Sequence, residues 1–386
     1  MVSLIPTDAD DPVALQDALR GALSGGPALG LGMIDGAAEQ VPDGTAAVIA
    51  TSGSTGIPKR VVLSAEALRA GAEATAERIG SGRWLLALPA GYVAGLQVLV
   101  RSLVAGTAPV ALAGRFSPRS FAEATLSMLR PAAGAGGTLP ELYTALVPAQ
   151  LSTLLDAADD TAVRGALGAY RAILVGGQAL PEPLRERASD LGIRLVRTYG
   201  STETAGGCVY DGVPLDRVAV RVVDGELRIA GPQLADGYLG DQALTDRTFV
   251  RDDHGLRWYR TGDLGLVHDG VVRVQGRADN VIVSGGINIS LDLVERVVRQ
   301  VPGLHDAVVV GVDDERWGEA SVIVAARGAA LRRSETDQLV HARDAVEAEL
   351  GKHARPARLI LVDELPMRAS GKPDREAIRA AVAELR

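Results

Sequence analysis

The chain has 386 residues, of which 47% are hydrophobic and 23% charged, and its formal net charge is −8. This length exceeds what one ordinary hydrophobic core fills, so we expect two domains. The acidic balance argues against nucleic acid or an anionic membrane as the main partner.

The cysteine and histidine content excludes further classes of protein. Cys208 is the only cysteine, so this chain has no internal disulfide and no cysteine metal cluster. The five histidines are scattered without the spacing of zinc ligands. The acidic residues near the N-terminus do not resemble a signal peptide, and no apolar run approaches a membrane span. We therefore expect a cytoplasmic protein without a membrane partner, and the sequence is compatible with a homodimer.

Short apolar strands alternate with helices over the first half of the chain. The helices are expected at 64–80 and 95–106, and the strands at 46–51, 84–89, 108–112, 172–177 and 193–200. This alternation predicts a layered α/β domain with parallel strands.

The pattern changes after about Cys208. Two hairpins with Asp-Gly turns are expected at 218–230 and 264–275. The last third predicts a small α+β unit, with helices at 291–300 and 341–350 and strands at 305–312, 321–328 and 358–366. We place a large N-terminal domain at 1–278 and a small C-terminal domain at 279–386.

Lysine is rare in this chain. Among 40 basic residues the only lysines are Lys59, Lys352 and Lys372. Arginine serves wherever a generic positive charge suffices, so the lysines are candidates for sites that need a compact ammonium group. Chance survival is the alternative for each of them.

The string TSGSTGIPK at 51–59 follows a buried strand. Its small and hydroxyl residues leave backbone N–H groups free to hold phosphate oxygens, and Lys59 adds a positive charge. It is not an ordinary P-loop, because Pro58 stands where that motif needs glycine and Arg60 where it needs Ser or Thr. A plain turn is the alternative.

Two further strings combine an aromatic residue with an acid. In YGSTE (199–203) the ring could stack on a base, a hydroxyl could reach a phosphate and Glu203 could bind Mg²⁺. In YRTGDLG (259–265) an aspartate could accept hydrogen bonds from a ribose diol. The alternatives are a strand ending in a capped helix and a hairpin turn.

The last two strings carry cations. GRADNVIVSGGINI (276–289) contains Arg277, which could hold ribose or phosphate, and paired glycines that let backbone approach a ligand. PMRASGKPDR (366–375) carries Lys372 in a loop whose alternative is a solvated surface turn.

Together and in this order, the five strings resemble the adenylate-forming superfamily of acyl-CoA synthetases, peptide-synthetase adenylation domains and luciferases. The resemblance runs from about Thr51 to the end of the chain. It implies the adenylate-forming enzyme fold: an α/β N-terminal domain of layered sheets and helices with a β-rich subdomain, and a small, mobile α+β C-terminal domain. It also implies ATP, Mg²⁺ and the co-substrate coenzyme A.

The resemblance implies a role for each matching residue. Lys372 would bridge the acid and the α-phosphate, Thr202 would contact phosphate and Glu203 would bind the metal. The phosphate loop would comprise Thr51, Ser52, Gly53, Ser54, Thr55, Gly56 and Lys59. The other ATP-binding residues would be Gly176, Gly177 and Gln178 beside adenine, Tyr199 stacking on it, Gly200, Ser201, the ribose-binding Asp263, and Arg277 at the domain junction. Asp279 would be the hinge, and Gly285 and Gly286 would meet coenzyme A.

Within the superfamily, the chain is most similar to the o-succinylbenzoate–CoA ligases of menaquinone synthesis in their short actinobacterial form. The likeness rests on residues 86–107 and on a short N-terminal region. There are two departures: Gly91-Tyr92 stands where the family commonly has histidine or another aromatic, and Asn280 replaces an acidic residue after the hinge.

The acyl pocket is expected around Tyr92, Gly95, Gln97 and Arg101. If 95–106 is a helix, Gln97 and Arg101 share one face, and Arg101 could meet a second substrate carboxylate. A surface charge is the alternative interpretation of Arg101.

We predict an ATP-dependent acid–CoA ligase that works through an acyl-adenylate and acts on o-succinylbenzoate. The alternatives are a CoA ligase for another aryl or fatty acid, a domain that loads a carrier protein, and a nucleotide-binding protein of this fold without turnover.

Overall fold

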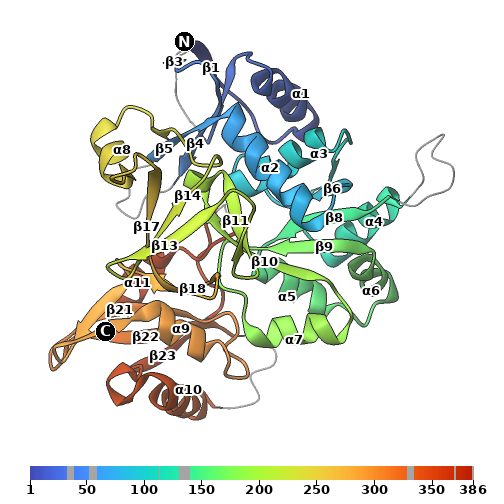
Figure 1. Ribbon diagram of the computed structural model, residues 1–386. Coiled ribbons are helices and arrows are strands. Elements are labelled where there is room, and N and C mark those ends of the chain that lie inside the picture. Colours follow the sequence, from blue (N-terminus) through green and yellow to red (C-terminus); the bar gives the residue numbers. More distant parts are fainter. Residues whose placement is uncertain are drawn as a thin grey trace.

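The structure is a computed structural model that describes residues 1–32, 39–51, 59–112, 114–129, 140–327, 334–368 and 371–384. The described strands form four sheets with helices packed between and outside them (Figure 1). None of the helices in this described part has the length and apolar character needed to cross a membrane.

The first sheet is built mainly from the start of the chain. Its strand order is β15-β5-β4-β2-β1-β3. The strands are β1 (Val2–Pro6), β2 (Ala28–Leu31), β3 (Glu39–Val41), β4 (Thr45–Thr51), β5 (Lys59–Ser64) and β15 (Gly237–Tyr238). The pairs β1–β2 and β2–β4 are parallel, whereas β5 runs antiparallel to both β4 and β15.

The second sheet is largely parallel, with the order β12-β11-β10-β9-β8-β6-β7. Its strands are β6 (Arg83–Leu86), β7 (Val110–Ala111), β8 (Leu142–Leu146), β9 (Tyr170–Val175), β10 (Leu195–Ser201), β11 (Gly206–Tyr210) and β12 (Val213–Pro214). The run from β7 to β10 is parallel, so the carboxyl ends of β8, β9 and β10 lie along one edge.

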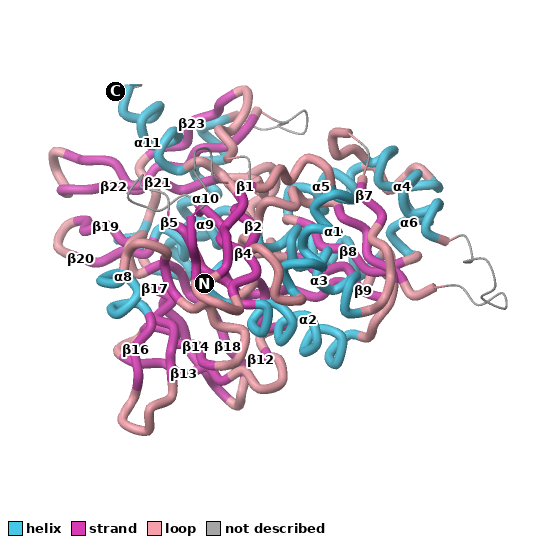
Figure 2. Tube along the Cα trace, turned by 90° about the horizontal axis from the view of Figure 1, so that it is seen from above, coloured by secondary structure: helices cyan, strands magenta, loops and turns pink. Residues whose placement is uncertain are grey.

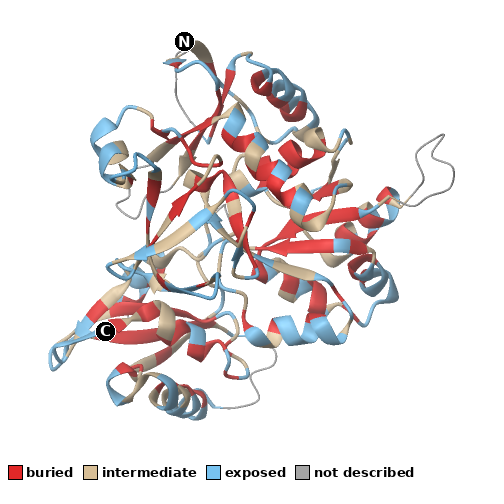
Figure 3. Ribbon diagram, in the orientation of Figure 1, coloured by how far each residue is buried: buried red, intermediate tan, exposed pale blue. Residues whose placement is uncertain are grey.

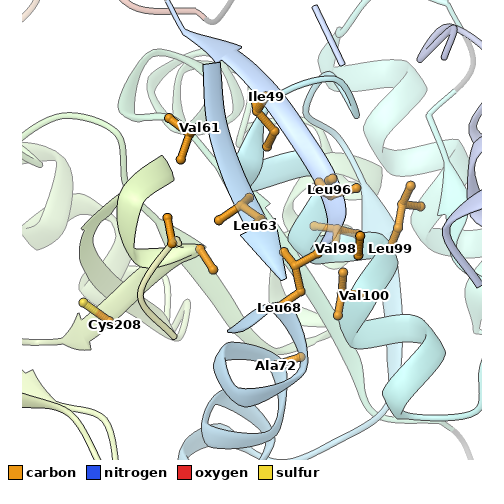
Figure 4. Packing of buried hydrophobic residues seen from close by; sticks show 14 of the residues in the cluster. Ile49, Val61, Leu63, Leu68, Ala72, Leu96, Val98, Leu99, Val100 and Cys208 are labelled. Atoms are coloured by element: carbon orange, nitrogen blue, oxygen red, sulfur yellow. The ribbon is translucent and has the colours of Figure 1, made fainter. Parts of the chain in front are cut away.

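Helices fill the layers around these two sheets. Three of them contribute to one core with both sheets: α1 (Pro12–Leu23), α2 (Ala65–Ile79) and α3 (Val93–Val104). Figure 4 shows this core, where Ile49 and Leu63 of the first sheet lie near Leu68 of α2 and residues of α3. The other face of the second sheet is covered by α4 (Pro118–Met128), α5 (Pro148–Asp156), α6 (Thr161–Gly168) and α7 (Glu182–Asp190).

The third sheet is antiparallel, with the order β13-β14-β17-β16 and β18 beside β17. Its strands are β13 (Ala219–Val223), β14 (Glu226–Ala230), β16 (Phe249–Arg251), β17 (Arg257–His268) and β18 (Val271–Arg277), and α8 (Gln242–Thr248) precedes β16. The Asp-Gly turns at Asp224 and Asp269 have positive φ at both central residues, the geometry that two-residue hairpins require.

The fourth sheet lies in the C-terminal region, which we define as residues 279–386. Its strands are β19 (Val281–Ser284), β20 (Ile287–Ser290), β21 (Val308–Asp314), β22 (Gly318–Ala326) and β23 (Arg358–Val362). The helices α9 (Leu291–Val298) and α10 (Glu335–Leu350) share a core on one side, whereas α11 (Arg375–Glu384) contributes to a separate core with β21 and β22. In Figure 1 this region lies below the third sheet, where α9 contacts β18, and Figure 2 shows β19–β22 on the opposite side of the molecule from α4 and α6.

The predicted fold class is confirmed: layered α/β sheets, a β-rich subdomain and a small α+β region. Buried segments follow the central strands of the sheets, and exposed ones lie on peripheral helices and loops (Figure 3). One helix differs, because α10 begins at Glu335, six residues before the expected start, where Ser334 caps it by accepting from the backbone N–H of Asp337. The division between 278 and 279 stays a prediction, and it falls between β18 and β19.

Candidate active site

The carboxyl edge of the parallel strands presents bare backbone. Gly176 follows β9, and a Cβ there would lie 2.3 Å from Thr198 Oγ1, so no side chain fits. The next residue, Gly177, has a φ of +82°. A cleft at the carboxyl ends of parallel strands is the usual place for a ligand in an α/β sheet, and bare glycines let a flat group approach closely.

The strand next to β9 adds the second motif to this edge. Gly200 lies so close to β11 that a Cβ would stand 2.1 Å from Gly206 O. Ser201 closes β10 and donates from Oγ to the hydroxyl of Tyr259 at 3.4 Å. Thr202 then opens a one-turn 3-10 helix, η1 (Thr202–Thr204), which carries Glu203.

Asp263 faces this edge from β17. Its Oδ2 accepts a 2.6 Å hydrogen bond from the Tyr199 hydroxyl, and its Oδ1 lies 3.4 Å from Nη1 of Arg277. Burial raises the pKa of the Asp263 carboxyl, while the Tyr199 hydrogen bond and the Arg277 charge act in the opposite direction. The ring predicted to stack on adenine and the acid predicted to hold ribose therefore lie in direct contact.

Arg277 connects Asp263 to Asp279, the predicted hinge residue. Its guanidinium binds Asp279 in a two-bond pair, with both N···O distances 3.0 Å, and it also donates to Thr261 O. The hydrogen bonds from Arg277 lower the pKa of the Asp279 carboxyl. The predicted hinge acid is thus tied to the predicted junction arginine.

Lys372 reaches the same place from the C-terminal region. Its Cε lies 3.6 Å from the position that a Cβ on Gly177 would take, and Gln178 Nε2 donates to Gly371 O at 3.3 Å. The residue as a whole keeps exposed surface, but its ammonium group is enclosed enough that desolvation lowers the pKa of Lys372. The nearby carboxylates of Glu203 and Asp263 act in the opposite direction. The charges of two acids from distant parts of the sequence therefore act on this cation.

The phosphate loop is described only at its two ends. Thr51 and Lys59 pair across β4 and β5, and Thr51 Oγ1 donates to Lys59 O at 3.3 Å. Lys59 Nζ lies 5.8 Å from the centre of the Tyr238 ring. The remaining predicted loop residues lie outside the described residues: Ser52, Gly53, Ser54, Thr55 and Gly56.

The predicted acyl-pocket residues sit at the start of α3 and along its buried face. Tyr92 is the residue before the helix, and a Cβ on Gly95 would lie 2.2 Å from Pro89 O. Gln97 is 1% exposed, donates to Leu68 O, and keeps a buried Oε1 without a partner among the described residues.

Arg101 lies one turn beyond Gln97 on the same face. It is 7% exposed, stacks on the Trp84 ring at 5.1 Å and donates to the Tyr210 hydroxyl at 3.3 Å. The interpretation of Arg101 as a surface charge is therefore wrong.

The predicted coenzyme A residues lie elsewhere in the structure. Gly285 and Gly286 form the exposed turn between β19 and β20, and Gly285 N donates to Trp317 O at 2.8 Å. These contacts belong to the C-terminal region. The structure thus brings Lys372, and not this glycine turn, to the strand edge.

A polar hollow of about 480 Å³ lies at the opposite edge of the second sheet. Its lining includes Leu142 and Tyr170, where β8 and β9 begin, together with Arg171 and Arg194. Ligands of open α/β sheets bind at the carboxyl ends of the strands, so we do not assign this hollow to the reaction.

The acid set at the strand edge fits a metal that is shared with a phosphate ligand. The described residues include no cluster of three or more His, Cys, Asp or Glu that could enclose an ion. Magnesium is commonly held by one or two carboxylates together with substrate phosphates, so Glu203 alone is an adequate protein ligand. One of its oxygens, Oε1, accepts from the Tyr238 hydroxyl at 2.9 Å.

Tyr238 is the site residue that the sequence analysis missed. It lies in the string ADGYLG, which contains one acid, Asp236, but no cation, and which is typical of a turn. Its only sequence signal is an aromatic residue beside a glycine. The contact with Glu203 appears only because β15 joins the edge of the first sheet.

Two family descriptions match the chain. Residues 9–239 match the AMP-binding enzyme family, and residues 293–372 match the AMP-binding enzyme C-terminal domain. The chain therefore belongs to the AMP-binding enzyme family, whose fold combines these two parts.

Two relatives with named activities are similar to this chain over most of its length. The chain is 39% identical, over 88% of its own length and 85% of the relative's, to a probable 2-succinylbenzoate–CoA ligase of Mycobacterium tuberculosis (strain CDC 1551 / Oshkosh). It is 29% identical to the 2-succinylbenzoate–CoA ligase of Listeria monocytogenes (serotype 4b, strain F2365), over 86% of this chain and 69% of that one.

Solved structures agree with this assignment. The o-succinylbenzoate CoA synthetase of Bacillus subtilis, in complex with the acyl-adenylate intermediate OSB-AMP, matches with a TM-score of 0.72 and 25% identity, over 95% of this chain and 80% of that one. ATP-bound MatB from Rhodopseudomonas palustris matches with a TM-score of 0.73 and 23% identity, over 92% and 71%, a likeness of fold alone.

Proposed function

We propose that this chain is an ATP-dependent ligase that converts a carboxylic acid to an acyl-adenylate and then to an acyl-CoA thioester. The observation that carries the proposal is the position of Lys372 beside Gly177, where the charges of Glu203 and Asp263 act on its ammonium group. A nucleotide at this edge would have a cation at its reacting phosphate and acids for its ribose and its metal.

The first step joins two anions. An oxygen of the acid attacks the α-phosphorus of ATP, the bond to the β-phosphate oxygen breaks, and pyrophosphate leaves. Lys372 reduces the repulsion between the carboxylate and the phosphate, and this stabilisation acts where charge develops in the transition state. Mg²⁺, which Glu203 would hold together with the ATP phosphates, supplies further neutralisation of phosphate charge.

In the second step the thiolate of coenzyme A attacks the acyl carbonyl, and AMP leaves with the electron pair of the anhydride bond. This step does not need a cation between carboxylate and phosphate. We propose that the C-terminal region rotates about Asp279, which withdraws Lys372 and brings Gly285 and Gly286 to the cleft. The two-domain division at 278 and 279 is part of this proposal.

We propose o-succinylbenzoate as the acid. Relatives described as ligases for this acid support the choice, and so does the buried face of α3. The Cγ atom of Gln97 lies 3.2 Å from the position that a Cβ on Gly206 would take. Gly206 lies close to the end of η1. Arg101 lies about 6 Å further along the helix axis. An aromatic acid with a second carboxylate would extend from the reacting centre toward this cation.

The test is product formation by the purified chain with ATP, Mg²⁺, coenzyme A and one acid at a time. We expect an acyl-CoA from o-succinylbenzoate, detected by mass spectrometry, with equimolar AMP and pyrophosphate. Thioester formed only from benzoate or a fatty acid would refute the substrate. ATP binding without turnover on any acid would refute the ligase.

A further inference from the structure

Glu203 depends on its neighbours for its orientation. The helix η1 has three residues and ends at Ala205 in the left-handed conformation, with φ of 49°. One turn of helix cannot fix the direction of a glutamate side chain, which has three rotatable bonds. In this structure the fixed point is the Tyr238 hydroxyl, 2.9 Å from Glu203 Oε1.

Tyr238 belongs to a short segment, 235–239, that joins Glu203 to the strand leaving the phosphate loop. At one end Ala235 N donates to Glu203 O at 2.8 Å. Along the segment Asp236 N donates to Val62 O at 2.9 Å, and Leu239 N donates to Arg60 O at 2.8 Å. The segment therefore ties the metal-binding candidate and β5 into one hydrogen-bonded unit.

The backbone at Tyr238 has little freedom. Gly237 has a φ of +151°, and a Cβ there would lie 2.5 Å from Thr245 Cγ2, so only glycine fits. Tyr238 N donates to Thr245 Oγ1 at 2.9 Å. Tyr238 is 7% exposed, and the centre of its ring lies 6.0 Å from the centre of the Phe249 ring. The hydroxyl is thus held in one place by packing.

Lys59 approaches the same ring. Its ammonium nitrogen lies 5.8 Å from the ring centre, within the range in which a cation is attracted to an aromatic face. The phosphate-loop cation and the Glu203 carboxylate therefore have one tyrosine in common. Glu203 Oε2 has no hydrogen-bond partner among the described residues and stays available to a ligand.

We propose that Tyr238 is a positioning residue for adenylation. Its hydroxyl holds one oxygen of Glu203 so that the other meets the divalent cation on ATP, and its ring keeps Lys59 beside the phosphates. This inference rests on the proposed function and adds a residue to it.

The experiment compares Tyr238→Phe with the full wild-type chain. The divalent site is probed with Mn²⁺ in the presence of a non-hydrolysable ATP analogue, by electron paramagnetic resonance. We expect about tenfold weaker Mn²⁺ binding, the ratio that follows from loss of one hydrogen bond to a charged group. Acid-dependent ATP–pyrophosphate exchange should fall about tenfold at low Mg²⁺ and recover at saturating Mg²⁺.

Two controls separate positioning from general damage. Tyr170→Phe removes a buried hydroxyl that bonds Thr125 at 2.8 Å on α4, and it should leave Mn²⁺ binding unchanged. Thr245→Ala frees the backbone of Tyr238 and should weaken Mn²⁺ binding in the same direction by a smaller factor. If Tyr238→Phe does not fold, the Thr245→Ala variant still tests the positioning role of Tyr238.

A double-mutant cycle decides the mechanism. In a Glu203→Gln background, Tyr238→Phe should change Mn²⁺ binding less than about twofold, because the two groups act together. Wild-type Mn²⁺ affinity in Tyr238→Phe, or a full tenfold loss in the Glu203→Gln background, would overturn the inference. Failure of the wild-type chain to form any thioester would instead refute the proposed function.

Discussion

The two sides of the candidate site are held in different ways. Glu203 and Asp263 each accept a hydrogen bond from a tyrosine hydroxyl on a strand of the N-terminal region, at 2.9 and 2.6 Å. Lys372 sits in a turn of the C-terminal region that touches the strand edge through Gly177 and through one 3.3 Å hydrogen bond from Gln178. Both acids are therefore held by hydrogen bonds within the N-terminal region, whereas the cation lies in a turn that makes one hydrogen bond to the strand edge among the described residues.

This difference matches the two chemical steps. Fixed acids reduce the cost of ordering the nucleotide, which stays bound through both steps. A cation with a weak attachment can leave after the first step at little cost in free energy. The following experiments test this contrast, beginning with the largest expected effect.

Lys372→Ala should separate the half-reactions. We expect acid-dependent ATP–pyrophosphate exchange to fall by about a thousandfold or more, since loss of a charged group at a transition-state charge has this scale. Thioester formation from supplied acyl-adenylate should remain within about threefold of the wild type. Lys352→Ala, an exposed lysine of the same region, is the matched control. Equal loss of both half-reactions would show that the lysine serves the whole cycle.

Asp263→Asn tests the fixed side. The change removes the negative charge that meets Tyr199 and Arg277, and we expect about a hundredfold lower adenylation, mostly through weaker ATP binding. Both half-reactions should suffer, because AMP must be held in each. Asp252→Asn is the control, since Asp252 accepts from Trp258 Nε1 in the same sheet, away from the strand edge. A selective loss of the first half-reaction would contradict a fixed ribose-binding role.

The pH profile of adenylation should report Lys372. Desolvation lowers the pKa of this lysine, so its ammonium form is lost at a lower pH than the usual value of about 10.4. The exchange rate should therefore fall tenfold per pH unit above that lowered pKa. Lys372→Arg, with a cation of higher pKa, should move the alkaline limb to higher pH. If the exchange rate falls at the same alkaline pH in the wild type and in Lys372→Arg, the fall reports the titration of another group.

Asn280→Ala should have the smallest effect. Asn280 Nδ2 donates to Asp292 Oδ1 at 2.7 Å, and the other oxygen of Asp292 accepts from Arg277 N at 2.7 Å. Loss of one such contact costs about 1 kcal/mol, so each half-reaction should change about fivefold or less. A change above tenfold in the thioester half-reaction, measured by single-turnover kinetics, would show that the contact between Asn280 and Asp292 limits the proposed rotation.

Most of the fold follows from local patterns in the sequence. The strands at 46–51 and 193–200, the helix capped by Ser64 and the Asp-Gly hairpins lie where periodicity and turn chemistry place them. These features depend on residues within a few positions of each other. The early start of α10 was missed because its first turn, Glu335–Gln338, is polar and carries no apolar stripe.

Only part of the candidate site could be predicted from the sequence. The five strings predict which residues would meet a nucleotide, since glycines beside a strand end and rare lysines have a chemical reason to be there. Arg101 shows the limit: its sequence neighbours fit a surface charge equally well, and only contacts with Trp84 of β6 and Tyr210 of β11 make it a buried cation.

What the sequence determined by itself is the set of chemical groups and the elements that carry them, because both follow from residue type and short-range spacing. What the tertiary structure decided is which groups meet. Tyr238 reaches Glu203 because β15 pairs with β5 across more than 170 residues of chain, and Lys372 reaches Gly177 because the C-terminal region packs against the strand edge. Such contacts depend on how sheets and domains pack, and no local pattern of residues encodes that packing.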